Sequence, residues 1–402
     1  NNSTAHYNTA VGAYALNANT TGIRNTAVGW KALDENTTAS YNTAIGDHAL
    51  ALNTTGTENT AVGQQALDAN TTGNYNTAFG TNTLGANTTA SNNSAFGWKA
   101  LFSNTTGAYN TAVGRSALND LTTGSSNTAM GYGAGYSHTT ASNNTALGGW
   151  ALHNNTTNGD NSAVGYYALL ANTTGEKDTA IGSYALDANT TGDRNVASGY
   201  GALSTNTTGS YNTAVGYIAL FDQTTATRNT AFGYKAGQNV TTGTANTYLG
   251  PDTAANATTG DGNIAIGNGA GGDAVFDITT DSNRVVIGNN NISHSYIKVD
   301  WTVTSDERDK TDIQDISRGL DFVNQLKPKS FWFRKERGSD VKHGAKRLGF
   351  IAQDILALEG SDPVIIDNEK EDHLKYKGEH LVPVLVNAIK ELSAKVEALE
   401  AK

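Results

Sequence analysis

The stretch N-T-A-V-G-A-Y-A-L-N-A-N-T-T-G-I-R, residues 8–24, is the first of sixteen consecutive copies of one 17-residue unit, N-T-A-[VIF]-G-x-x-A-L-x-x-N-T-T-G-x-x. The copies begin at residue 8 and at every seventeenth residue up to residue 263, with no insertion or deletion between these starts. We number the positions of each copy 1 to 17. A fixed short period in which one residue type returns to one position is typical of a solenoid, in which each copy forms one coil stacked on its neighbour.

Each copy contains a short apolar segment, a glycine corner, a second small apolar segment and a polar corner. Position 5 is Gly in all sixteen copies, and position 3 is Ala in all but one, where Tyr248 stands. Position 4 is apolar in every copy except at Ser198, and Leu recurs at position 9. Glycine allows a sharp turn that residues with side chains resist. Two turns per coil predict a flattened, two-sided β-roll.

A single coil of this kind has little to bury. Strand alternation puts Thr9 and Val11 on one face and Ala10 on the other, so each coil offers one medium-sized side chain, one Leu and a few Ala to a core. A roll this slender leaves an Ala-rich outer face in water, and we therefore expect the outer faces of three rolls to pack about a common axis. With coils about 4.7 to 4.9 Å apart, sixteen coils form a rod of roughly 75 Å.

The composition changes near residue 300. Residues 1–304 contain 10 Lys and Arg and 18 Asp and Glu, whereas the last 98 residues contain 17 and 19. No proline precedes Pro251, as expected for a ladder of stacked strands. We therefore expect a mainly β chain with a β-solenoid over 1–267, a β-rich connector over 268–304 with strands in N-R-V-V-I-G and S-Y-I-K-V-D-W-T-V, and a compact α+β domain over 305–402.

Composition also excludes several classes of function. The chain has no cysteine, so disulfides and thiolate zinc sites are excluded, and its net charge of -10 argues against a nucleic-acid partner. No apolar run is long enough to insert into a membrane. No paired-carboxylate or metal-ligand spacing recurs, so we expect no metal, no cofactor and no external substrate. The chain begins at position 11 of a unit, and we expect any signal peptide, anchor or particle-attachment domain to lie upstream.

Four motifs near the C-terminus carry a resemblance to a known family. They are T-S-D-E-R-D-K-T-D-I at 304–313, G-L-D-F-V-N-Q-L-K-P at 319–328, G-F-I-A-Q-D at 349–354 and L-V-P-V-L-V-N-A-I-K-E-L at 381–392. In this order they resemble the endosialidase-type intramolecular chaperone domain that ends many phage tail fibres and tailspikes. The resemblance implies a homotrimeric folding aid that cuts itself off after the fibre has assembled. It also implies a catalytic Ser/Lys pair, which falls on Ser305 and Lys310, with scission between Thr304 and Ser305.

The residues around this pair allow two interpretations. A Ser hydroxyl becomes nucleophilic when a base takes its proton, and a partly desolvated Lys can be that base. On residue type alone, Thr304 and Glu307 also fit a capping box that opens a helix. Five residues turn about 140° around a regular helix, so either Ser305 lies in an extended lead-in or Lys310 comes from a neighbouring chain. Asp309 stands where the family often has Leu, and a carboxylate there favours the protonated amine, which is a weaker base.

The last twenty residues contain an apolar heptad pattern. The spacing 4, 3, 4, 3 places Ile and Val at a and Leu at d, in Leu385, Ile389, Leu392, Val396 and Leu399. This pattern predicts a short coiled-coil helix that forms the seam of a trimer. In isolation this choice of residues favours two strands over three, and the preceding domain would set the number. The alternative is that the stripe packs on its own domain.

The first functional hypothesis is a structural and adhesive segment of a phage tail fibre or tailspike. It is a homotrimer in the virion, made in the host bacterial cytoplasm, and any enzymatic activity is at most self-cleavage in cis. Positions 6, 7, 16 and 17 vary, and aromatic side chains there can stack on a host receptor or glycan. The alternative is that these positions vary because nothing constrains them. The residues concerned are Tyr14, Lys31, His48, Trp150 and Tyr167 at position 7 and Tyr7, Tyr41, Tyr75, Tyr109 and Tyr211 at position 17.

Two further hypotheses come from other classes of protein. The head of a trimeric bacterial surface adhesin uses similar N-[ST]-x-[AV]-[IV]-G coils, but it predicts a downstream membrane anchor, whereas this chain ends in E-A-L-E-A-K. Ice binding is suggested by the Thr pair at positions 13 and 14, although only one Thr of each pair can face outward and the pair lies in a corner. The N-T-T triplets also match a glycosylation pattern, and we interpret them as turn residues.

The repeat itself raises a problem of alignment. Sixteen near-identical coils can pair out of register by one whole unit at little local cost. A trimer of such chains needs a device at one end that aligns them, and residues 305–402 are the predicted device.

Overall fold

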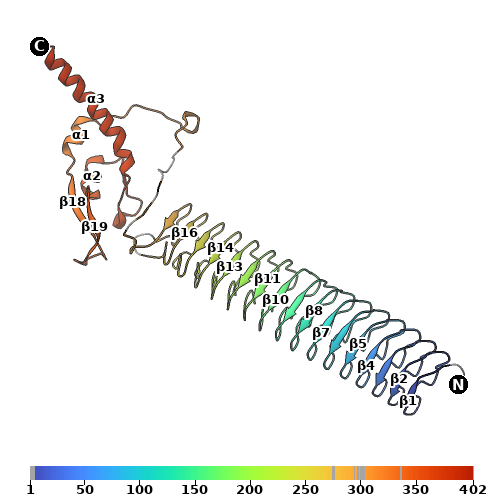
Figure 1. The fold of residues 1–402 in the computed structure, drawn as a ribbon. Coiled ribbons are helices and arrows are strands. Elements are labelled where there is room, and N and C mark those ends of the chain that lie inside the picture. Colours follow the sequence, from blue (N-terminus) through green and yellow to red (C-terminus); the bar gives the residue numbers. More distant parts are fainter. Residues whose placement is uncertain are drawn as a thin grey trace. The chain divides into compact units, whose positions relative to one another are not determined.

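The computed structural model describes residues 5–273, 277–293, 295, 296, 298, 304–335 and 337–401. The chain divides into two compact units, residues 1–289 and 290–402. The first is a β-solenoid and the second a small α+β unit, so the chain is mainly β, as predicted (Figure 1).

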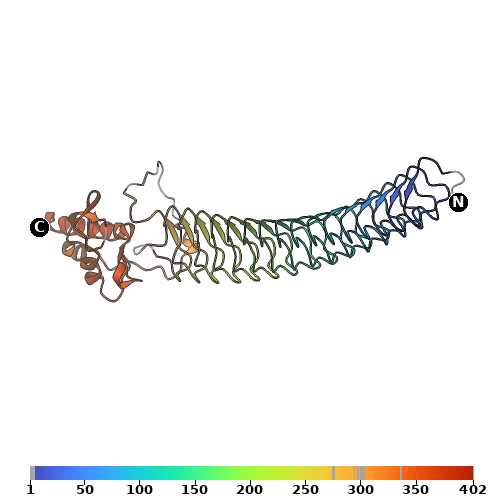
Figure 2. The same cartoon turned by 90° about the horizontal axis from the view of Figure 1, so that it is seen from below.

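Each coil of the solenoid contributes one three-residue strand at positions 2 to 4, and the strands align on one side of the stack (Figures 1 and 2). Neighbouring strands pair in parallel with partners 17 residues apart, for example Ala27 with Ala44. The strands are β1 (Thr9–Val11), β2 (Thr26–Val28), β3 (Thr43–Ile45), β4 (Thr60–Val62), β5 (Thr77–Phe79), β6 (Ser94–Phe96), β7 (Thr111–Val113), β8 (Thr128–Met130), β9 (Thr145–Leu147), β10 (Ser162–Val164), β11 (Thr179–Ile181), β12 (Val196–Ser198), β13 (Thr213–Val215), β14 (Thr230–Phe232), β15 (Thr247–Leu249), β16 (Ile264–Ile266) and β17 (Val285–Ile287).

The sheet continues past the last regular copy. The segment N-R-V-V-I-G forms β17, which pairs with β16 through Ile264 and Val285, 21 residues apart. The last coil therefore holds four residues more than the others. Of the other expected connector strand, residues 297 and 299–303 lie outside the described residues.

The core of the solenoid is built from positions 3, 8 and 9, as in Ala27, Ala32 and Leu33, which are fully buried. The expectation that the Thr and Val of each strand face the core was wrong, because position 4 points outward and Phe79 is 51% exposed. The interior of each coil is narrow. Once the Leu side chain of position 9 is inside, the strand can add only the methyl group of an Ala. Strand alternation then turns positions 2 and 4 toward solvent.

Each coil turns its corners with left-handed residues. Positions 7, 9 and 17 have positive φ even where they are not Gly, as in Leu33 with φ 52°. This conformation costs an L-residue roughly 1 to 2 kcal/mol, which burial of a Leu side chain, about 1.5 to 3 kcal/mol, offsets. Position 5 is stricter: Gly114 has φ 129°, and a Cβ there would lie 2.6 Å from the carbonyl oxygen of Gly131 in the next coil. No other residue fits.

Exceptions to the repeat compensate one another inside the core. Position 9 is Gly at Gly135, Gly237 and Gly271, which leaves space where a Leu side chain usually lies. His138 fills the first space and Tyr248 the second, since a Cβ on Gly135 would lie 3.2 Å from the His138 ring and a Cβ on Gly237 2.6 Å from the Tyr248 ring. The single Tyr at position 3 is therefore explained by the Gly that precedes it by eleven residues.

Two ladders of buried amide side chains run along the solenoid, one at position 1 in every coil but that of Asp178 and one at position 12 in most coils. At position 1, Asn25 Oδ1 accepts from the backbone N–H of Asn42 at 2.9 Å, and its Nδ2 donates to the Ala39 carbonyl at 2.8 Å. At position 12, Asn36 Nδ2 donates to Asn19 Oδ1 at 2.9 Å and to the Ala39 carbonyl at 3.1 Å. The Asn of the N-T-T corner is thus more than a turn residue, because its side chain satisfies polar groups inside the coil.

Two further ladders lie at the corners. The hydroxyl of each position-13 Thr donates to the position-13 carbonyl of the next coil, as from Thr54 to Thr71 at 3.1 Å. The position-14 Thr, such as Thr55, is exposed, so one Thr of each pair faces outward. At position 16 the backbone N–H of Asn74 donates to the side-chain oxygen Ser91 Oγ at 2.9 Å. Position 16 is therefore constrained to small polar acceptors in many coils and does not vary freely.

The C-terminal unit, residues 290–402, is built around a small apolar core of Ile355, Ile365, Ile366, Leu381 and Val384. Strands β18 and β19 form an antiparallel hairpin, as do β20 and β21. The elements are η1 (Glu307–Asp309), α1 (Leu320–Gln325), β18 (Lys329–Arg334), β19 (Lys342–Gly349), α2 (Ala352–Glu359), β20 (Ile366–Asp367), η2 (Glu371–His373), β21 (Lys375–Tyr376), η3 (Gly378–His380) and α3 (Leu381–Glu400).

Within the described residues, none of the helices has the length and apolar character of a membrane span. The same residues contain no cluster of three or more His, Asp or Glu side chains that could hold a metal ion.

Candidate self-cleavage site and helix seam

The predicted cleavage segment forms a tight turn. Its central residues are the short 3₁₀ helix η1, and Asp306 is the residue that caps it, accepting from the backbone N–H of Arg308 at 2.9 Å. The Arg308 guanidinium also donates to the Asp306 carboxylate at 3.0 and 2.6 Å, and these bonds hold the pKa of that carboxyl below its usual value. The interpretation of Thr304 and Glu307 as a capping box is therefore wrong. The residue that caps η1 is Asp306, whose carboxylate accepts from the backbone N–H of Arg308.

The turn brings the two predicted catalytic residues together. Asp306 is extended at φ -66° and ψ 136°, so Ser305 lies in an extended lead-in before η1. Lys310 leaves the turn in an extended conformation and folds back along it. Its Nζ lies 2.8 Å from Ser305 Oγ and 3.0 Å from the Ser305 carbonyl oxygen. Of the two arrangements that helix geometry allowed, the structure has the one within a single chain.

The pair is open to water in one chain. Ser305 and Lys310 are both exposed, and Thr304 Oγ1 donates to the Asp309 carboxylate at 3.4 Å. Among the described residues no ion pair joins Asp309 to Lys310. The Asp309 carboxylate accepts from Thr304 instead. General-base catalysis by a lysine requires partial removal from water, and a single chain does not provide it.

Two side chains of α3 anchor the segment that follows the predicted cleavage site. Glu391 Oε2 accepts from the Leu320 backbone N–H at 2.8 Å and so caps α1. Asn387 Nδ2 donates to the Arg318 carbonyl at 3.0 Å. A side chain on Gly319 would overlap the Glu391 carboxylate, which explains the Gly between them. Sequence reasoning missed these contacts, because residues 71 positions apart give no local pattern.

A second carboxylate, that of Glu359, holds another part of the C-terminal unit in place. The Glu359 side chain is fully buried and accepts from the backbone N–H groups of Val364, Ile365 and Ile366 at 2.8, 2.8 and 2.9 Å. The Arg318 guanidinium lies 3.4 Å from the same carboxylate. One side chain therefore fixes the loop between α2 and β20 and ties it to the segment before α1.

The predicted seam lies on the exposed side of α3. Leu381, Val384 and Ala388 are buried, and the first two belong to the core of the unit. The seam residues lie on other faces of the helix and are 39 to 70% exposed. They are Leu385, Ile389, Leu392, Val396 and Leu399. The helix thus meets its own domain through a different stripe and leaves the heptad stripe uncovered within the chain.

The aromatic side chains of the solenoid surface fall into two kinds of column. At position 6, Tyr200, Tyr217 and Tyr234 stack with centroids 5.5 Å apart and interplanar angles of 14° and 10°. Their faces are covered by one another, so they present edges and hydroxyls to water. The position-17 Tyr residues lie two coils apart or more, and Tyr75 and Tyr109 are among the most exposed aromatics.

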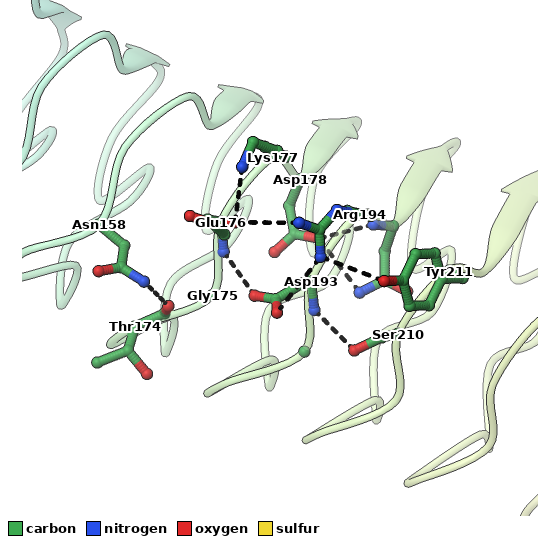
Figure 3. A network of polar contacts seen from close by, with 12 residues as sticks. Asn158, Thr174, Gly175, Glu176, Lys177, Asp178, Asp193, Arg194, Ser210 and Tyr211 are labelled. Carbon is green, nitrogen blue, oxygen red and sulfur yellow. Dashed lines mark hydrogen bonds and ion pairs between the residues drawn. The ribbon is translucent and has the colours of Figure 1, made fainter.

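Charged residues at positions 16 and 17 form a network across three coils (Figure 3). Glu176 accepts from Lys177 Nζ at 2.7 Å and from the Arg194 guanidinium at 3.3 Å. Arg194 also donates to the Tyr211 hydroxyl at 3.3 Å. These side chains bind one another along the stack, which lowers the pKa of the Glu176 carboxyl through the Lys177 hydrogen bond.

Two titratable residues interrupt the buried amide ladders. Asp178 replaces the Asn of position 1 and accepts from the Asn195 backbone N–H at 2.8 Å. Burial raises the pKa of its carboxyl to about 7. His138 replaces the Asn of position 12, and burial lowers the pKa of its imidazole to about 4. The Asp178 carboxyl is therefore mostly protonated below about pH 7, and the His138 imidazole is mostly neutral above about pH 4.

Comparison with known protein families identifies one matching region. Residues 305–361 match the family model described as chaperone of endosialidase. The match begins at Ser305 and covers α1, β18, β19 and α2, whereas the 381–392 motif lies beyond it. Neither the curated proteins nor the solved structures contain a match to this chain. The architecture is thus a β-solenoid followed by a region of the endosialidase-chaperone type.

Proposed function

We propose that this chain is a homotrimeric structural and adhesive segment of a phage tail fibre or tailspike. Its C-terminal unit aligns three chains during folding and then separates itself by cleavage between Thr304 and Ser305. The observation that carries the proposal is the coincidence of two features at one residue. The chaperone match begins at Ser305, and the hydroxyl of that residue lies 2.8 Å from Lys310 Nζ.

The cleavage step uses only groups of this chain and water. Neutral Lys310 takes the proton from Ser305 Oγ, which attacks the carbonyl carbon of Thr304. The C–N bond breaks as the proton passes to the departing amine of Ser305, leaving an ester between the two residues. Water then hydrolyses the ester, so that Thr304 ends in a carboxylate and Ser305 regains its hydroxyl beside a free amino terminus.

Exposure of the pair in one chain couples cleavage to assembly. In a trimer, a neighbouring chain that covers the Ser305/Lys310 pair would exclude water from it, and a lysine requires this exclusion to act as a base. A monomer or a misaligned assembly keeps the amine hydrated and stays uncut. Cleavage then reports correct folding.

The internal ladders explain why the shaft needs such a device. Each coil bonds to the next through the same amides and hydroxyls, for example Asn36 to Asn19 and Asn53 to Asn36 at 2.9 and 3.1 Å. The contacts that recur in every coil therefore contain little information about which coil of one chain should face which coil of another. The C-terminal unit does not repeat, so three copies of it can associate in only one alignment.

Receptor contact falls on the position-17 column. Tyr75 and Tyr109 are exposed, whereas the rings of Tyr200, Tyr217 and Tyr234 cover one another. Exposed rings offer faces on which a sugar can stack. Binding of the trimer to host surface polysaccharide should therefore weaken in Tyr75→Ala and Tyr109→Ala and persist in Tyr217→Ala. Equal binding by all three variants would remove the column from the proposal.

Autoproteolysis is tested with Ser305→Ala and Lys310→Ala in the full chain. Denaturing gels and mass spectrometry should show wild-type fragments of residues 1–304 and 305–402, with Ser305 at the new amino terminus, and an uncut chain in both variants. Ser317→Ala and Lys327→Ala are the matched controls, since both residues are exposed in the same unit, and they should cut normally. Light scattering should give three chains per particle for every variant. An uncut wild-type trimer would remove cleavage from the proposal, and a stable monomer would remove alignment as well.

A further inference from the structure

The strands of the solenoid present a continuous apolar surface to solvent. The strands β1 to β16 lie on one side of the stack (Figure 1). The side chains of positions 2 and 4 are at least partly exposed whereas position 3 is buried in all coils after the first, and we call the outward-facing side chains of positions 2 and 4 the strand face. Parallel pairing places one position-4 side chain above another in every coil. Those at least 36% exposed are Val11, Ile45, Phe79, Phe96, Met130, Val164, Ile181, Phe232, Leu249 and Ile266.

The strand face carries no charge. None of the sixteen copies has a charged residue at positions 2 to 4, and the charged residues of 8–267 all fall at positions 1, 6, 7, 10, 11, 16 and 17. The one polar residue at position 4, Ser198, is accompanied on the same strand by Val196 at position 2, which is exposed. Every coil therefore keeps an outward-facing apolar side chain on this face.

The size of the strand face exceeds what a solitary soluble chain normally exposes. The ten side chains that are at least 36% exposed, together with the less exposed apolar side chains between them, present about 1,000 Å² of apolar surface, whereas the largest patch of a typical monomer is roughly 300 to 600 Å². A stable interface buries about 800 Å² on each partner. The face is thus large enough to hold two chains together along their length.

The periodicity of the face identifies its partner. One side chain recurs per coil at a spacing of about 4.8 Å, set by parallel strand pairing. An irregular protein surface cannot match this spacing over sixteen coils, whereas a second copy of the chain matches it at every level. Side-chain size varies along the column, and the rings of Phe79 and Phe96 stack at 6.3 Å between the smaller Val62 and Val113. Only in-register copies place these rings at equal levels.

We infer that the strand face is the surface on which three copies of the solenoid pack, in register, about a common axis. The inference rests on the proposed homotrimer and specifies which face of each coil lies inside it. The Ala residues that were expected at this interface are instead buried within each coil. The charged and tyrosine-bearing corners at positions 16 and 17 then remain on the outside.

The absence of cysteine from the chain allows a direct test. Single cysteines are placed at position 4, in Ile45→Cys and Ile181→Cys, and at exposed position 14 of the same two coils, in Thr55→Cys and Thr191→Cys. A three-fold axis brings identical residues together, so a mild oxidant or a short bismaleimide should join the position-4 variants into dimers and trimers on denaturing gels. Their cross-linked fraction should exceed that of the position-14 variants at least fivefold. Far-UV circular dichroism and light scattering establish that each variant is folded and trimeric.

The outcomes separate this inference from the proposed function. Trimers in which the position-14 cysteines link and the position-4 cysteines do not would place another face at the axis. Trimers in which neither links would mean that the solenoids stand apart and only the C-terminal units associate, which overturns the inference alone. A folded monomer overturns the homotrimer and the inference together. If such a monomer also lowers the freezing point of its solution, the face binds ice instead of a second copy.

Discussion

The solenoid and the C-terminal unit are stabilised by different kinds of polar contact. In the solenoid the buried amide side chains bond within their own coil and to the next coil at fixed sequence separations of 3, 14 and 17 residues, so the same few contacts recur along the stack. In the C-terminal unit single side chains satisfy several partners at once, as Glu359 does for three amides and Glu391 for the start of α1. Repeated contacts make a long rod from little sequence information, whereas unrepeated contacts make a structure with one possible alignment. The difference predicts where each unit should be fragile.

The largest effect is expected where the rod has no alternative residue. Gly114→Ala places a Cβ 2.6 Å from the carbonyl oxygen of Gly131, and the two backbones cannot separate without breaking the hydrogen bonds between coils. We expect a loss of about 5 kcal/mol in the stability of the solenoid and a protease-sensitive site near residue 114. Thermal unfolding followed by circular dichroism and limited proteolysis measure both.

Gly338→Ala is the matched control in the C-terminal unit. Gly338 also has positive φ, 83°, but no described atom lies within 4 Å of the Cβ position. Only backbone strain remains, and the expected cost is about 1 kcal/mol. Similar losses in the two variants would show that crowding between coils is not what requires Gly at position 5.

The ladder residue Asp178 should make the solenoid weaker as pH rises. The folded chain holds the carboxyl proton up to a pKa of about 7, whereas the unfolded chain releases it near 3.8. The folded state therefore binds more protons between these values, and stability falls as pH rises through them. Asp178→Asn completes the amide ladder and should raise the unfolding free energy by about 4 kcal/mol at pH 8 and by much less at pH 4. The exposed Asp160→Asn should change neither, and a gain for Asp178→Asn that does not depend on pH would contradict the prediction.

In the C-terminal unit, Glu359→Ala should unfold one unit without affecting the other. It leaves three buried amides and the Arg318 guanidinium without their acceptor, which costs about 3 kcal/mol. Denaturant unfolding should show an earlier transition for the C-terminal unit, reported by Trp332 fluorescence, and an unchanged transition for the solenoid. Glu379→Ala, at an exposed position, is the control. A shift of both transitions would mean that the units do not unfold independently.

The smallest effect is expected at His138 and has the opposite pH dependence to that of Asp178. The pKa of this imidazole is lowered to about 4, so the unfolded chain takes up a proton near 6.5 while the folded chain does not. Stability is complete above pH 6.5 and falls as pH decreases toward 4, by about 2 kcal/mol at pH 5. His138→Leu, which adopts the residue found at the same position of the preceding coil in Leu121, should abolish this loss. Hydrogen exchange at pH 7 and pH 5 measures the difference, and an acid loss that persists in the variant would assign it to another group.

The repeat predicted much of the fold, and the misses have physical causes. Strand alternation correctly placed Ala on one face of each strand and Thr and Val on the other. It does not say which of the two faces points toward the core. The direction depends on the width of the coil, which no single unit reveals. The Asn at position 12 has the same sequence signature as an ordinary turn residue, because a turn and a buried ladder both favour a short amide side chain.

The candidate site was predicted in its residues and only partly in its geometry. The motif around 304–313 placed Ser305 and Lys310, and helix geometry left two arrangements open. The Asp306 cap and the short η1 turn selected the arrangement within one chain. The supporting contacts from Asn387 and Glu391 had no local signal, since they join residues about 70 positions apart.

By itself, the sequence determined the period, the corners that require Gly and the change of composition near residue 300, and its resemblance to a known family singled out Ser305 and Lys310 as the predicted pair. The period and the Gly corners follow from local chemistry that recurs in all sixteen copies, whereas the boundary and the pair follow from composition and from the motifs of the last 98 residues. Only the tertiary structure decided which side of each strand faces the core, which polar side chains become ladders and how Lys310 reaches Ser305. Those choices depend on how neighbouring coils and distant helices share space, and one residue cannot specify them until the others are in place.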